Sequence, residues 1–146
     1  MGDPYELQRF VDAQGEADTY GSAIRELRSG RKRTHWMWFV FPQLRNLGVS
    51  PTAQFYGISG LAEAQAYLAH PVLGTRLVEC AQVLTALPTS DAVAIFGSVD
   101  AQKLQSSMTL FSRVENTGPI FGAVVDHYFG GEVDTRTIDL LRDAAN

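Results

Sequence analysis

The strongest constraint on the fold is a run of six apolar residues, Trp36 to Phe41, of which four are aromatic. If Thr34 caps a short helix that Pro42 ends, successive side chains advance by about 100° and the apolar groups point in every direction. A helix that is apolar all round belongs in the centre of a core. We therefore expect this segment to form the central core helix.

Helix signals recur along the rest of the chain. Asp3-Pro4 and Ser50-Pro51 each pair a capping residue with proline at the first helical position, and Asp134 can cap the last helix. No stretch alternates between apolar and polar residues for more than four positions, so no sheet is expected. The sequence predicts an all-α fold: a compact single-domain bundle of eight or nine short helices over residues 1–146.

Composition places the chain among soluble cytoplasmic proteins. A length of 146 residues suits one domain, and 45% hydrophobic with 19% charged residues is typical of a globular protein. Cys80 is the only cysteine, which excludes an intrachain disulfide and fits a reducing compartment. The N-terminus has no signal-peptide pattern, and the longest apolar run is far shorter than the roughly 20 residues of a membrane span.

The charge distribution is uneven. The net charge of −4 makes nucleic-acid binding an unfavoured prediction, yet five of the twelve basic residues fall within nine positions. Arg31, Lys32 and Arg33 stand before the N-terminus of the predicted core helix, where cations are unfavourable. A bound anion would remove the conflict, with His35 as a further donor. The alternative is that these side chains point into solvent or pair with acidic residues elsewhere.

A second polar group lies on the helix predicted over residues 98–113. Lys103, Ser106 and Ser107 share one face of it at spacings of three and four. They could contact a phosphate or carboxylate, form a Ser–Lys nucleophile, or make an ordinary solvated face. No metal or other cofactor is expected, because the histidines and the cysteine show no ligand spacing.

The segment Gly30–Gln43 (GRKRTHWMWFVFPQ) resembles the signature of an uncharacterised family, domain of unknown function 1810. Similar likeness is found in His70–Leu77, in Ile95–Gly97 and in the positions from Asp100 to Phe111 that follow. The resemblance spans nearly the whole chain and implies a compact all-helical fold, but no activity. A calpastatin-like label carried by some members has no support here, since inhibitor segments of that kind are disordered and polar.

Three functions are compatible with these observations. The first is a monomeric domain that binds a small anionic, nucleotide-like ligand in a basic and aromatic cleft around His35. Its expected contacts are Arg31, Lys32, Arg33, His35, Trp36, Trp38, Gln43, Lys103, Ser106 and Ser107. The second is an enzyme with His35 as general acid/base, assisted by Lys103 and a serine. The third is a protein-interaction module with an exposed apolar patch at the tryptophans and an unidentified partner.

Overall fold

The computed structural model describes residues 2–145, which form helices, connecting turns and one isolated bridge between Leu44 and Ile58. The all-α prediction is confirmed, because no sheet is present in this range. The α-helices are α1 (Gln8–Gly15), α2 (Thr19–Arg28), α3 (Met37–Val40), α4 (Pro51–Phe55), α5 (Leu61–Ala69), α6 (Leu73–Ala86), α7 (Ala92–Phe96), α8 (Ser98–Ser112), α9 (Ile120–Phe129) and α10 (Thr135–Ala145).

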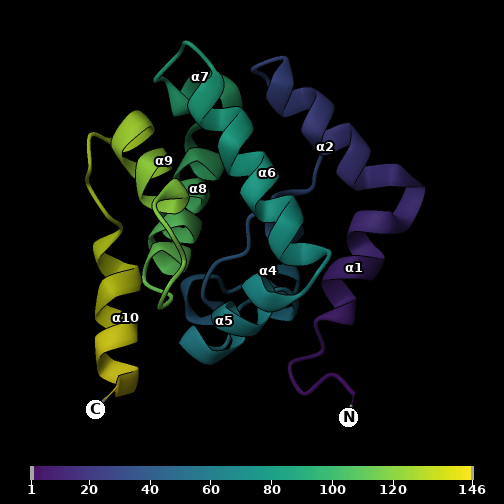
Figure 1. The fold of residues 1–146 in the computed structure, drawn as a ribbon, viewed down its shortest axis with the longest axis vertical. Coiled ribbons are helices and arrows are strands. Elements are labelled where there is room, and N and C mark those ends of the chain that lie inside the picture. The colour runs from purple at the N-terminus through teal and green to yellow at the C-terminus, as the bar shows by residue number, and fades with distance from the viewer. Residues whose placement is uncertain (1, 146) are drawn as a thin grey trace.

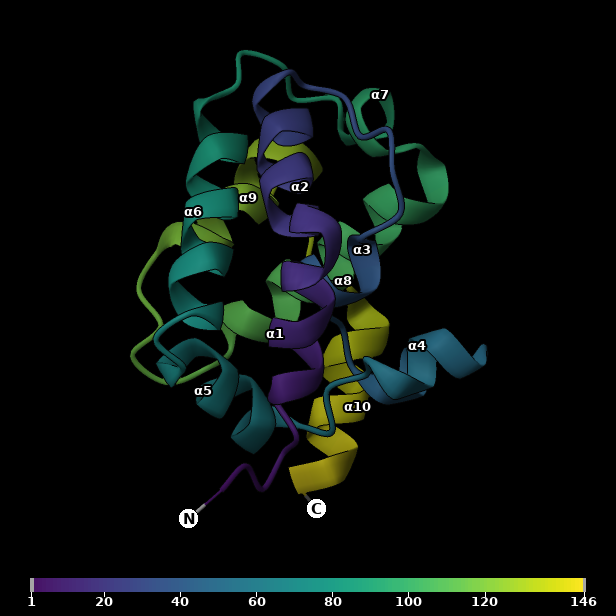
Figure 2. The same ribbon diagram turned by 90° about the vertical axis from the view of Figure 1, so that its right-hand side faces the viewer.

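Helix α8 is the centre of the arrangement and packs against α5, α7, α9 and α10. Helix α6 contacts α2, α5 and α9, and α1 packs on α2 and α3. Figure 1 shows α10 along one edge of the molecule and α1 along the other, and Figure 2 shows α4 projecting from the side. None of the helices within the described range is long and apolar enough to cross a membrane.

A string of aromatic rings joins four helices through the core. Phe10 of α1 meets the edge of Tyr67 of α5 with ring centroids 5.1 Å apart. Tyr67 then lies 5.4 Å from Phe111 of α8, which lies 5.8 Å from Phe121 of α9. All four side chains are fully buried. Each such pair contributes about 0.5–1.5 kcal/mol beyond the burial of its area.

The predicted central helix is shorter than expected. Only four residues form α3, and Thr34 does not cap it. Four of the six apolar residues in the run are buried, whereas Trp38 and Phe39 are only partly covered. The segment is therefore a core element on one side only, and Trp38 is accessible from outside.

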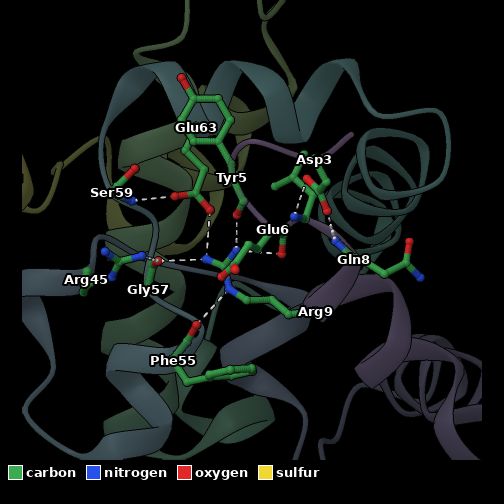
Figure 3. Close-up of polar contacts among 11 residues, drawn as sticks. Asp3, Tyr5, Glu6, Gln8, Arg9, Arg45, Phe55, Gly57, Ser59 and Glu63 are labelled. Carbon is green, nitrogen blue, oxygen red and sulfur yellow. Dashed lines mark hydrogen bonds and ion pairs between the residues drawn. The ribbon is translucent and has the colours of Figure 1, made fainter. Parts of the chain in front are cut away.

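A guanidinium that the sequence analysis did not single out ties the N-terminal segment to the middle of the chain (Figure 3). All five N–H groups of Arg9 are used. They donate over 2.5–3.0 Å to four backbone carbonyls and one carboxylate, those of Tyr5, Glu6, Phe55 and Gly57 and that of Glu63.

The Arg9–Glu63 pair is almost fully buried. The side chains are 7% and 2% exposed, and Nη2 of Arg9 lies 2.8 Å from Oε2 of Glu63. The other carboxylate oxygen accepts from the backbone N–H of Ser59. Arg9 and Glu63 thus link the start of α1 and the residues before it with the loop after α4 and the first turn of α5.

Replacing Arg9 should strongly destabilise the protein. In Arg9→Met the Glu63 carboxylate remains buried without its partner, which typically costs about 3–5 kcal/mol. We expect a loss of this size in the free energy of unfolding, measured by urea denaturation at pH 7. Arg25→Met is the control, because its pair with Asp18 is exposed and should contribute at most about 1 kcal/mol. Equal losses in the two variants would contradict a structural role for the buried pair.

Candidate functional site

The basic loop between α2 and α3 folds around a carboxylate from its own chain. Glu26, in the last turns of α2, accepts the backbone N–H groups of Arg33 (2.7 Å) and Thr34 (3.0 Å). It also accepts the Thr34 hydroxyl (2.7 Å) and the indole N–H of Trp36 (3.0 Å). An internal anion therefore satisfies backbone donors that the sequence analysis assigned to an external one.

These contacts change the acidity of Glu26. Burial alone would raise the pKa of its carboxyl, but the four hydrogen bonds favour the charged form more strongly and lower the pKa to about 2. The carboxylate is consequently ionised at any physiological pH. It is a permanent counter-ion for the loop.

The cations of the loop separate into two groups. Arg31, Arg33 and His35 are exposed to solvent. Lys32 turns inward: its side chain is only 8% exposed, and its Nζ lies 2.9 Å from Oδ2 of Asp100 and 5.1 Å from the ring centroid of Trp36. The cluster is therefore not a single binding surface.

Asp100 connects this loop to the polar face of α8. Its second oxygen lies 3.4 Å from Nζ of Lys103, whose ammonium sits 4.6 Å from the ring centroid of Trp38. Two lysines, each lying over a tryptophan, thus share one carboxylate. The structure in this way joins the two polar segments that the sequence analysis treated separately.

A cleft of about 320 Å³ opens beside Lys103. The elements that form it, α3, α4, α8, α10 and the loop over residues 43–50, lie next to one another in Figure 2. Its lining residues are Trp38, Gln43, Leu47, Gly48, Val49, Ser50, Ala53, Val99, Gln102, Lys103, Ser106 and Arg136.

Four of the ten residues predicted to contact a ligand line this cleft: Trp38, Gln43, Lys103 and Ser106. The other six lie elsewhere. Three are on the exposed loop, Lys32 lies behind Asp100, and Trp36 and Ser107 are fully buried in the core. His35 is outside the lining, so the structure does not bring it into one cleft with Lys103.

Arg136 was missed by the sequence analysis, and the hydrogen bonds around Asp134 explain its position. Asp134 caps α10, as predicted, and its Oδ2 accepts from the backbone N–H of Thr137 (3.0 Å) and from the hydroxyl of Ser106 (3.1 Å). This buried carboxylate anchors the start of α10 to α8. Arg136, two residues later, therefore reaches the cleft. Nothing in its sequence context distinguishes it from other exposed arginines.

The hydroxyl groups of the serine pair are engaged or enclosed. Ser106 Oγ lies 3.1 Å from both the carboxylate of Asp134 and the carbonyl of Gln102. Ser107 is fully buried, and its hydroxyl has no hydrogen-bond partner among the described residues. This arrangement favours Ser106 as a structural link rather than as a nucleophile.

The charged side chains in the lining of the cleft have the same sign. Two cations, Lys103 and Arg136, line it, and no Asp or Glu is among its described lining residues. The side-chain amides of Gln43 and Gln102 also border it. No group of three His, Cys, Asp or Glu side chains that could hold a metal ion occurs within residues 2–145.

Comparisons with known proteins identify the family. Residues 4–141 match the model of a family described as protein of unknown function (DUF1810). The chain belongs to this family. It is also similar to a solved structure, that of the conserved hypothetical protein Rv1873 from Mycobacterium tuberculosis, with 53% identity and a TM-score of 0.92 over 96% of this chain and 99% of that one. No protein with curated annotation matches the chain.

The family resemblance inferred from the tryptophan segment is thereby confirmed, as is the shared all-helical fold. Neither match brings an activity with it. A function for this chain has to be inferred from the cleft itself.

Glu26→Gln should weaken the loop in a pH-dependent way. Because the pKa of Glu26 is lowered from 4.5 to about 2 in the folded protein, its stabilising effect is complete above about pH 4.5 and is lost as the pH falls toward 2. We expect the variant to be about 1–2 kcal/mol less stable at pH 7, because solvent screens this partly exposed carboxylate, with the difference shrinking below about pH 4.5. Urea denaturation at several pH values measures it.

Glu115→Gln is the matched control, because Glu115 is exposed and its side chain makes no hydrogen bond among the described residues. It should leave stability within about 0.5 kcal/mol of the parent. A Glu26→Gln variant whose deficit did not depend on pH would contradict the role of this carboxylate as the counter-ion of the loop.

Proposed function

We propose that this protein binds a small anionic ligand in the cleft formed by α8, α10 and the loop over residues 43–50. One observation carries the proposal. A protein of net charge −4 has a cleft lined by two cations and by no carboxylate among the described residues. An anion that enters it meets attraction there and no like charge in the wall.

The donors present suit such a ligand. The ammonium of Lys103 has three N–H groups, and one of them faces Asp100, which leaves others for a ligand. Arg136 supplies a guanidinium that can bind two oxygens at once, and it makes one long contact of 3.4 Å to the Leu47 carbonyl. Gln43 and Gln102 add neutral donors. The volume of about 320 Å³ is at the small end of the range for ligand sites.

The proposed site differs from the sequence-based one in its position. It centres on Lys103 rather than on His35. Cys80 is buried, and burial raises the pKa of its thiol to about 12, which suits an unreactive cysteine in the cytoplasm.

Inorganic phosphate tests the proposal. Isothermal titration at constant ionic strength should show binding to the parent protein and affinity about tenfold lower in each of Lys103→Gln and Arg136→Gln. The estimate follows because a hydrogen bond to a charged group contributes about 1.5–3 kcal/mol and 1.4 kcal/mol corresponds to a factor of ten.

Arg142→Gln is the control, since Arg142 lies on the same helix as Arg136 but its side chain is 70% exposed and outside the cleft. It should bind phosphate like the parent. Absence of phosphate and sulfate binding to the parent protein, or unchanged affinity in both cleft variants, would refute the proposal.

A further inference from the structure

The residues of α8 that line the cleft change from apolar to polar and charged along the helix. Val99, Gln102, Lys103 and Ser106 follow at i, i+3, i+4 and i+7, so they form one stripe. With a rise of 1.5 Å per residue, the stripe is about 10 Å long. It begins with an apolar side chain, has the ammonium in the middle, and ends at the serine.

The position of Arg136 at the serine end of the stripe depends on the hydrogen bond between Ser106 and Asp134. Because that hydrogen bond holds the start of α10 against the last turn of the stripe, Arg136 enters the cleft from this side. Lys103 lies less than one turn before Ser106. Both cations thus line this cleft.

The opposite end of the stripe, at Val99, is apolar and open to solvent. Val99 is 67% exposed, and Val49, which also lines the cleft, is 92% exposed. Single exposed valines are ordinary. Because Val99 and Val49 line the same cleft as two cations, a ligand that carries an apolar group next to its charge would contact both kinds of side chain.

The two cations of the lining favour a ligand with more than one negative charge. Lys103 and Arg136 both line the cleft, whereas the carboxylates that contact its wall lie outside the lining: Asp100 pairs with Lys103 and Lys32, and Asp134 accepts the hydroxyl of Ser106. A phosphate monoester carries a charge of about −1.5 to −2 at pH 7, whereas a carboxylate carries one.

One face of the Trp38 ring is already covered by an ammonium group. Since the ammonium of Lys103 sits 4.6 Å from the ring centroid of Trp38, a ligand ring cannot stack there without displacing it. The apolar group is recognised by the valines instead. A volume of about 320 Å³ admits a compact group beside the anion.

We infer, on the basis of the proposed function, that the ligand is a soluble phosphate monoester of a compact apolar group. The phosphate contacts Lys103 and Arg136, and the apolar group extends toward Val99. This assignment names the class of ligand for the anion site and places its two parts at opposite ends of the stripe.

Isothermal titration at matched ionic strength tests the inference with four soluble probes: inorganic phosphate, n-butyl phosphate, pentanoate and adenosine monophosphate. Co-sedimentation with phosphatidate vesicles tests a lipid as the source of the phosphate. Butyl phosphate should bind more tightly than inorganic phosphate, by about fourfold for each methylene group that the cleft buries. It should also bind at least about tenfold more tightly than pentanoate, because the second charge meets a second cation.

Val99→Ser separates the apolar contribution from the anionic one. It should weaken butyl phosphate binding toward the affinity of inorganic phosphate and leave inorganic phosphate unchanged. Val93→Ser is the control, because Val93 is 56% exposed but lies outside the cleft, and it should bind both probes like the parent.

Each contrary result has its own meaning. If inorganic and butyl phosphate bind equally well, or if adenosine monophosphate binds more tightly than butyl phosphate, the ligand class is overturned while the anion site stands. If the protein sediments with vesicles containing phosphatidate but does not bind butyl phosphate, the assignment to a soluble ester is overturned. If no phosphate binds, the proposed function fails with it.

Discussion

The interaction between Glu26 and the loop over residues 33–36 determines much of what surrounds it. One carboxylate accepts two backbone N–H groups, a hydroxyl and the indole of Trp36, so the loop closes over α2 and the tryptophan enters the core. Lys32 is held by the same turn, and its backbone N–H donates to the carbonyl of Ile95. That places its side chain beside Asp100 and so links the loop to α8.

Two buried carboxylates also link separate segments of the chain. Glu63 forms an ion pair with Arg9, and Asp134 joins α10 to α8 through a hydrogen bond from Ser106. Buried polar groups are costly unless they are paired, and in each case a group from a distant part of the chain provides the pairing. Both buried carboxylates thus have hydrogen-bond partners within the protein. The positive charge at Lys103 and Arg136 stands out because the cleft lining around it contains no acid within the described residues.

The starts of helices could be predicted from the sequence where the capping contact joins neighbouring residues. Ser50 and Asp91 accept hydrogen bonds from the N–H groups three residues on, at the starts of α4 and α7, as their sequence patterns predict. The start of α1 was less predictable. Asp3 accepts the N–H groups of Leu7 and Gln8, and the helix begins only at Gln8 because Glu6 adopts a positive φ of 53°. A capping residue indicates that a helix follows, not how many residues intervene.

The sequence by itself determined the all-helical fold, the core position of Trp36 and the family, because periodicity, capping residues and a specific aromatic segment are local properties. It also indicated Trp38, Gln43, Lys103 and Ser106 as candidates for a ligand site. Only the tertiary structure decided that these four line one cleft with Arg136, while His35 lies outside it. The reason is that ion pairs and hydrogen bonds between distant helices decide which charged groups find partners. The spacing of residues along the chain does not indicate those partners.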